Sequence, residues 1–141
     1  MLYSEAVKES KKAMKLYMNI VDQRPKEFNS ENEYKKHCIK ELDADLRMCC
    51  GARDVLRFRD LELQDSTYVT TTSMKIFDFI KNGIKVLEID FDLLPVDEFG
   101  SRVEEYTTCL RKVCEVFKEI SERSNEPTED VELDDLILGK K

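Results

Sequence analysis

The chain has 141 residues, of which 41% are hydrophobic and 38% are charged. This length suffices for one domain with a substantial core, and the composition is that of a globular rather than a disordered chain. The formal net charge of −7 opposes broad binding to nucleic acid or anionic membranes, because both require clustered cations. We therefore expect a single globular domain over residues 1–126 and an acidic C-terminal tail over residues 127–141.

Cysteine usage and the N-terminal sequence bear on the cellular compartment. No apolar run is long enough to span a bilayer, and residues 1–5 contain no hydrophobic region of a signal peptide. The cysteines are odd in number and show no CxxC spacing, so we predict reduced, buried thiols, no metal site and no other cofactor. A cytoplasmic or nuclear protein is expected. The five are Cys38, Cys49, Cys50, Cys109 and Cys114.

The first fifty residues predict two helices. Apolar residues in the first recur in steps of three and four, and Pro25 ends it. The second begins at Ser30, which forms a capping box with Glu33. Gly51 is expected to end this helix as its C-cap, because glycine adopts the left-handed conformation without steric cost. The seam predicted for the first helix consists of Tyr3, Val7, Met14, Tyr17 and Val21.

Residues 54–94 change period and favour a sheet. Thr67 to Ser73 contains a β-branched run, and Leu87 to Leu93 alternates strictly between apolar and acidic residues. Asn82-Gly83 indicates either a hairpin turn or a helix C-cap. We predict an α+β fold with two N-terminal helices, a small antiparallel three-stranded meander and a long C-terminal helix. The alternative is an all-α four-helix bundle, since Ile76, Phe77, Ile80, Ile84 and Leu87 also have helical spacing.

The C-terminal helix has the most regular pattern in the chain. Ser101 and Glu104 form a second capping box, and the apolar rhythm continues to Ile120. Such a seam closes inside the domain or pairs with another chain. The order of helices, meander and closing helix is similar to that of the RWD-type heads that cap coiled coils in kinetochore and related complexes. This resemblance implies an assembly subunit.

Two clusters could carry chemistry. His37 shares a helix face with Glu33 and Glu41, an arrangement that could bind a divalent metal but more commonly forms a solvent-exposed ladder of charges. Asp90 and Asp92 resemble the Asp-x-Asp strand of nucleotidyltransferases, which holds magnesium for phosphoryl or nucleotidyl transfer. The upstream Gly-Ser turn of that family is missing here, and a solvated polar face is the other interpretation. No Gly-rich phosphate loop occurs.

The tail combines apolar anchors with acidic residues. Its spacing resembles the leucine-rich nuclear export pattern, in which such anchors enter a hydrophobic groove. Docking of the tail onto its own domain is the other interpretation.

The function expected from these features is that of a non-enzymatic protein–protein interaction or assembly subunit, in a homo- or hetero-oligomer, with no membrane and no nucleic acid as partner. The alternative is a metal-dependent phosphoryl- or nucleotidyl-transfer enzyme that uses Asp90 and Asp92. The predicted partner-binding residues are Val103, Tyr106, Leu110, Val113, Phe117, Val131, Leu133, Leu136 and Leu138.

Overall fold

A computed structural model describes residues 2–63 and 67–122. These residues form four helices, and no strand occurs among them. The predicted α+β fold is therefore wrong, and the all-α alternative is the fold found. The helices are α1 (Tyr3–Asp22), α2 (Glu31–Leu63), α3 (Thr67–Ile89) and α4 (Val96–Glu122).

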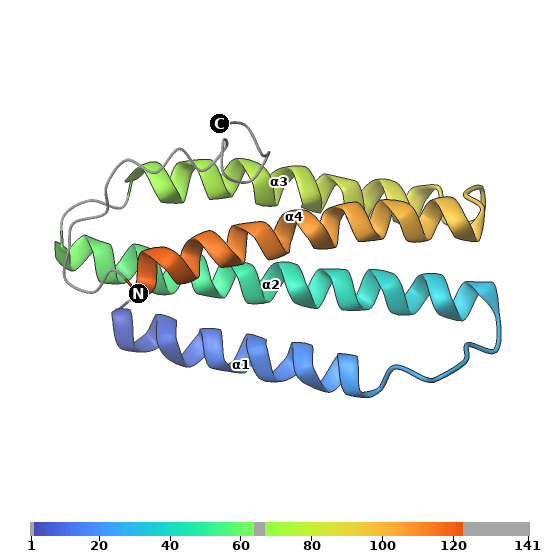
Figure 1. Cartoon of the computed structure of the whole chain (residues 1–141), viewed down its shortest axis with the longest axis horizontal. Helices are drawn as coiled ribbons and strands as arrows, with labels where there is room; N and C mark the ends of the chain where they lie inside the picture. The colour runs from blue at the N-terminus through green and yellow to red at the C-terminus, as the bar shows by residue number, and fades with distance from the viewer. Residues whose placement is uncertain (1, 64–66, 123–141) are drawn as a thin grey trace.

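The four helices run side by side along the long axis of the molecule (Figure 1). The central helix is α2, which packs against each of the other three, whereas α3 makes only a few contacts with α4. Within the described residues, α1 approaches α2 alone, and its backbone stays away from α3 and α4. As a result, α1 and α3 lie on opposite sides of the pair formed by α2 and α4 (Figure 1). This arrangement leaves one side of α3 and the space between α1 and α4 uncovered by helix.

The predicted meander is replaced by the end of α2, by α3 and by the turn that follows it. The alternation from Leu87 to Leu93 predicted a strand with all its apolar residues on one buried face, but these residues do not share a face. Leu87 is buried in the core, while Ile89 and Leu93 are exposed to solvent. The β-branched run from residue 67 to 73 lies in the first turns of α3. Its low helix propensity is overcome by tertiary packing of the inward face of α3.

Two glycines predicted to end elements instead lie inside helices, where another helix comes close. A Cβ on Gly51 of α2 would lie 3.2 Å from the Ser10 Cα of α1. A Cβ on Gly83 of α3 would lie 2.4 Å from the Tyr106 hydroxyl of α4. At Gly51 a Cβ would force α1 to move away by a few tenths of an ångström, and at Gly83 it would force the Tyr106 ring to move. The C-cap assigned to Gly51 and the turn or cap assigned to Gly83 are therefore wrong.

The predicted capping boxes have different outcomes. At the start of α2, the Glu33 amide donates to Ser30 Oγ at 3.1 Å, and the Asn29 amide donates to Glu33 Oε2 at 3.3 Å. Ser30 thus caps α2 as expected. The second box is wrong, because α4 begins at Val96 and Ser101 lies inside it.

The residues that α1 buries differ in part from the predicted seam. Ala6 and Ile20 are its buried residues, whereas Met14 is exposed. The small residues Ala6 and Ser10 lie on the side facing α2, and they permit the close approach at Gly51.

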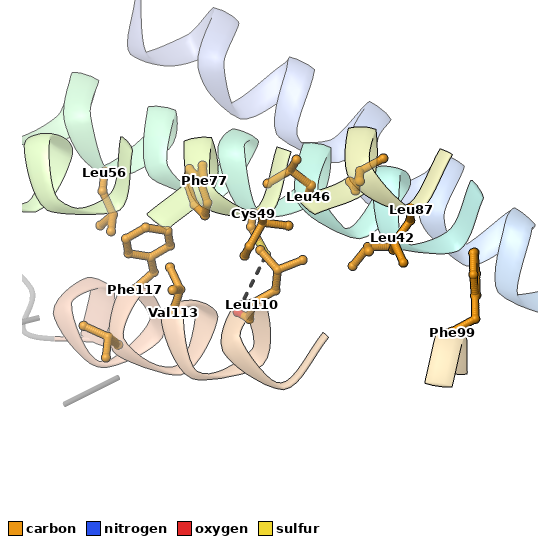
Figure 2. Packing of buried hydrophobic residues seen from close by; sticks show 13 residues of the cluster. Leu42, Leu46, Cys49, Leu56, Phe77, Leu87, Phe99, Leu110, Val113 and Phe117 are labelled. Atoms are coloured by element: carbon orange, nitrogen blue, oxygen red, sulfur yellow. Dashed lines mark hydrogen bonds between the residues drawn. The ribbon is translucent and has the colours of Figure 1, made fainter. Parts of the chain in front are cut away.

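The hydrophobic core lies between α2, α3 and α4 (Figure 2). Leu110 and Val113 of α4 are fully buried there, and Phe117 of α4 meets Phe77 of α3 edge to face at 6.3 Å between ring centroids. Aliphatic and aromatic side chains from all three helices interdigitate along this line. The buried members are Leu42, Leu46, Cys49, Leu56, Phe77, Ile80, Ile84, Leu87, Phe99, Leu110, Val113, Val116 and Phe117.

A buried lysine of α2 forms hydrogen bonds with the turn between α3 and α4. Lys35 Nζ donates to the carbonyl oxygens of Phe91 at 2.6 Å and of Leu94 at 2.7 Å. The same ammonium lies 5.4 Å from the Phe91 ring centroid and 5.5 Å from that of Phe99. Carbonyls at the end of a helix lack partners within the helix, and the ammonium supplies two hydrogen bonds to this segment.

Candidate functional site

The predicted partner-binding residues of α4 face the interior of the domain. Leu110, Val113 and Phe117 are buried, and Val103 and Tyr106 are half-buried against the same core. The seam of α4 is therefore occupied by α2 and α3 (Figure 2). The tail residues Val131, Leu133, Leu136 and Leu138 lie outside the described residues, as does the predicted domain boundary at residue 126.

A second apolar face, which the sequence pattern did not reveal, lies on the outer side of α3 and on the turn after it. Four large side chains on it are exposed: Phe79 at 63%, Val86 at 43%, Ile89 at 79% and Leu93 at 81%. We call these four residues the α3 surface. They were hidden in the sequence because Ile89 and Leu93 were assigned to the inward face of a strand.

The spacing of the α3 surface explains why it is separate from the core. Phe77, Ile80, Ile84 and Leu87 pack inward. The exposed residues Phe79 and Val86 are seven positions apart and fall on another face of the helix, and Leu93 lies in the turn after it. α3 therefore carries apolar side chains on two faces, and the described part of the chain covers one of them. Tyr106 connects the two faces, since its ring meets that of Phe79 at 5.8 Å between centroids.

The charges around the α3 surface are of both signs. Between residues 74 and 89, Lys75, Lys81 and Lys85 are exposed together with the carboxylates Asp78 and Glu88. These residues alone have a formal charge of +1, but Asp90 and Asp92 beside Leu93 bring residues 74–93, which hold the whole α3 surface, to −1. The helical part of the α3 surface is thus flanked by charges of both signs and its turn by carboxylates, so the apolar side chains rather than the net charge would select a partner.

A polar hollow of about 360 Å³ lies between α1, the loop after it, α2 and α4. Arg24 of the loop donates to Glu41 of α2 through Nε, at 3.1 Å from Oε2, and also through Nη2. This pairing ties the loop to α2 and neutralises the carboxylate. The hollow arises because α1 and α4 both pack on α2 without approaching one another.

The only histidine of the chain lines this hollow. His37 Nε2 lies 2.9 Å from Glu41 Oε2, within ion-pair distance, but its N–H direction does not meet hydrogen-bond geometry. Burial lowers the pKa of His37, and the nearby Arg24 and Lys40 lower it further, so the imidazole is neutral at pH 7. Glu33 caps the helix instead of joining His37. The metal interpretation of this helix face therefore loses one of its three proposed ligands.

A buried carboxyl forms the inner wall of the hollow. Asp45 of α2 is almost fully buried, and desolvation raises its pKa to about 6. Cys49 donates its S–H to Asp45 Oδ1 at 3.8 Å, and this bond and the charge of Arg111 both favour the ionised form. Burial outweighs them, because it disfavours the charged form of the carboxyl. Asp45 is therefore partly protonated near pH 6.

The acidic pair of the enzyme alternative is not on a strand. Asp90 and Asp92 lie in the turn after α3, where Asp90 is half-buried and Asp92 is exposed. In the described ranges 2–63 and 67–122, no group of three or more His, Cys, Asp or Glu side chains is placed to hold a metal ion. The strand geometry that would aim two carboxylates at magnesium is absent from this turn. The enzyme alternative thereby loses the observation on which it depended.

Comparison with known proteins finds no matching family model, no matching curated protein and no matching solved structure. Among the described residues, no helix combines the length and the apolar character that crossing a membrane would require.

Proposed function

We propose that this chain is a non-enzymatic interaction or assembly subunit of a cytoplasmic or nuclear complex, and that its α3 surface binds a protein partner. The observation that carries the proposal is the exposure of Phe79, Val86 and Ile89 on α3 and of Leu93 in the turn after it. Clustered exposed apolar side chains of this size tend to mark interaction sites, because leaving them in water is unfavourable.

The spacing supports a helical partner. Within α3, Val86 follows Phe79 by seven residues and Ile89 follows Val86 by three, a spacing that suits the packing of an amphipathic helix. The flanking charges are of both signs, with the lysines on α3 and the carboxylates Asp90 and Asp92 in the turn, so a partner helix would need charges of both signs to match them. The polar hollow supports the non-enzymatic assignment, because Glu41 is paired with Arg24 and is not free to act as a base.

The tail of this chain has apolar anchors of the kind that such a partner would supply. Its anchors Val131, Leu133, Leu136 and Leu138 stand among carboxylates. Docking of the tail on its own domain, or recognition of the tail as an export motif, are the two proposals for this segment. Deleting residues 127–141 separates them: loss of more than about 2 kcal/mol of stability makes the tail part of the fold. Unchanged stability together with loss of nuclear export supports the export motif.

The interaction proposal is tested with a photo-crosslinking amino acid in the full chain. Placed at Ile89, it should yield discrete protein adducts in cells. Placed at Met18, an apolar position on α1 that is 56% exposed against 79% for Ile89, it should yield few. Light scattering of the purified chain shows whether the adduct is a second copy. Equal labelling at both positions, or adducts that persist when Phe79 and Val86 are both changed to serine, would contradict the proposal.

A further inference from the structure

Two cysteines that are 65 positions apart in the sequence meet between α2 and α4. Cys49 Sγ and Cys114 Sγ are 2.7 Å apart, whereas the sulfurs of a disulfide are about 2.05 Å apart. Cys49 is fully buried, and its sulfur also lies 3.8 Å from the Leu110 carbonyl oxygen of α4 (Figure 2). Only a small movement of the two side chains is needed to join the sulfurs.

The two thiols differ in ionisation. The single S–H of Cys49 lies within reach of Asp45 and of Cys114, and either sulfur can be the donor between the two thiols. When Cys49 donates to Cys114, the hydrogen bond lowers the pKa of Cys114, although burial and the Asp45 carboxyl oppose this effect. The same hydrogen bond, together with burial, raises the pKa of Cys49. Of the two thiols, Cys114 is therefore the one that loses its proton more readily. The thiolate is the nucleophilic form of cysteine, so Cys114 is the more reactive member.

The two thiols also differ in access. Cys114 lines a surface hollow of about 250 Å³, which Ser10 of α1, Ala52 of α2 and Lys118 of α4 also line. This hollow lies in the same space between α1 and α4 as the polar hollow. A small oxidant can therefore reach Cys114 from solvent. Cys49 has no exposed surface and is reached only through its partner sulfur.

We propose that Cys49 and Cys114 are a peroxide-sensitive thiol pair that forms a reversible disulfide between α2 and α4. In the first step, the Cys114 thiolate attacks one oxygen of hydrogen peroxide, the O–O bond breaks, and hydroxide leaves. The product is a sulfenic acid on Cys114. The Cys49 sulfur then attacks the Cys114 sulfur, the S–O bond breaks, and the departing hydroxide takes the Cys49 proton as water. Peroxide gains two electrons, and each cysteine loses one hydrogen.

The disulfide product is detected by mass spectrometry of the full chain. After peroxide treatment and alkylation, tryptic peptide 48–53 should be linked to peptide 113–118 with the loss of two hydrogens, and glutathione should separate them. Peptide 48–53 contains both Cys49 and Cys50, so the Cys50→Ala variant fixes the assignment. Cys114→Ala should abolish the linked peptide, and the half-buried Cys109→Ala control should leave it unchanged.

The order of the two steps is tested by trapping the sulfenic acid. In Cys49→Ala, dimedone should label Cys114 after peroxide treatment, because the resolving thiol is missing. In Cys114→Ala, Cys49 should stay unlabelled. A peroxide-induced disulfide between Cys114 and any other cysteine would overturn the proposal. So would a wild-type Cys114 that alkylates after peroxide treatment as completely as Cys109; this last measurement requires no variant to fold.

Discussion

The apolar faces of α3 and α4 show how alike two stripes can be in composition and how different in surroundings. The seam of α4, with Leu110, Val113 and Phe117, is buried against α2 and α3. The outer face of α3, with Ile89 and Leu93, is exposed. Periodicity indicates that a helix face is apolar, but the covering element is set by the position of neighbouring helices. In this fold α4 has neighbours along its seam, whereas α1 lies on the far side of α2 and leaves α3 uncovered.

The largest expected effect comes from a charge in the α4 seam. Leu110→Glu should lower the free energy of unfolding by about 3–5 kcal/mol, because the carboxylate would be buried without a partner. Denaturant unfolding followed by circular dichroism measures the change. Thr108→Glu, on the exposed side of the same helix, is the matched control and should be close to neutral. If both variants unfold equally, the seam of α4 is not the core described here.

The buried carboxyl of Asp45 should make the free energy of unfolding depend on pH. Asp45 has a folded pKa of about 6 and an ordinary value of 3.8, so folding favours its protonated form. Its contribution to stability is fully present below pH 3.8 and is lost as pH rises through 6. The difference corresponds to about 3 kcal/mol, so Asp45→Asn should stabilise the protein by up to this amount at pH 8 and by little at pH 4.

Unfolding curves at both pH values check the Asp45 prediction. Asp43→Asn, which removes a more exposed carboxylate from the same helix, is the matched control. A variant Asp45→Asn that is less stable than wild type at pH 8 would indicate that the ionised carboxyl is stabilised by its surroundings.

The attachment of α3 to the rest of the fold is probed at Lys35. Lys35→Met keeps the length of the side chain but removes both hydrogen bonds to the carbonyls of Phe91 and Leu94. The expected cost is about 1–3 kcal/mol, because two partly buried carbonyl acceptors lose their donor. Hydrogen exchange should accelerate mainly at residues 86–94, with Lys36→Met as the exposed control. Uniform acceleration over all four helices would assign Lys35 to the global core instead.

The smallest change in stability is expected on the α3 surface. Ile89→Ser should alter the free energy of unfolding by no more than about 0.5 kcal/mol, because the side chain is already in water. The same variant should greatly weaken adduct formation by a crosslinker at position 86. A loss of stability comparable to that of Leu110→Glu would mean that Ile89 is covered within the domain, and the contrast between the two helices would fail.

Much of the helical content followed from local patterns. The start of α2 at the Ser30 cap and the apolar rhythm of α4 are confirmed, because both depend on residues within a few positions of each other. The sheet prediction failed where a strand-like alternation and a helical spacing occurred in the same residues. Leu87, Ile89, Phe91 and Leu93 alternate like a strand, although Leu87 ends the inward face of α3 and the next residues belong to its surface and turn.

The features proposed to carry function also divide into those that the sequence indicated and those that only the packing of the helices determined. Composition and spacing in the chain were enough to identify apolar helix faces, an acidic tail and the absence of a Gly-rich phosphate loop. Long-range packing placed the α4 seam inside, exposed the α3 surface and brought Cys49 to Cys114. Gly51 and Gly83 show the reason: a glycine has the same local signature at a helix end and at a close helix crossing. Which role it has depends on Ser10 and Tyr106, and these contacts exist only once α1 and α4 have packed on their neighbours.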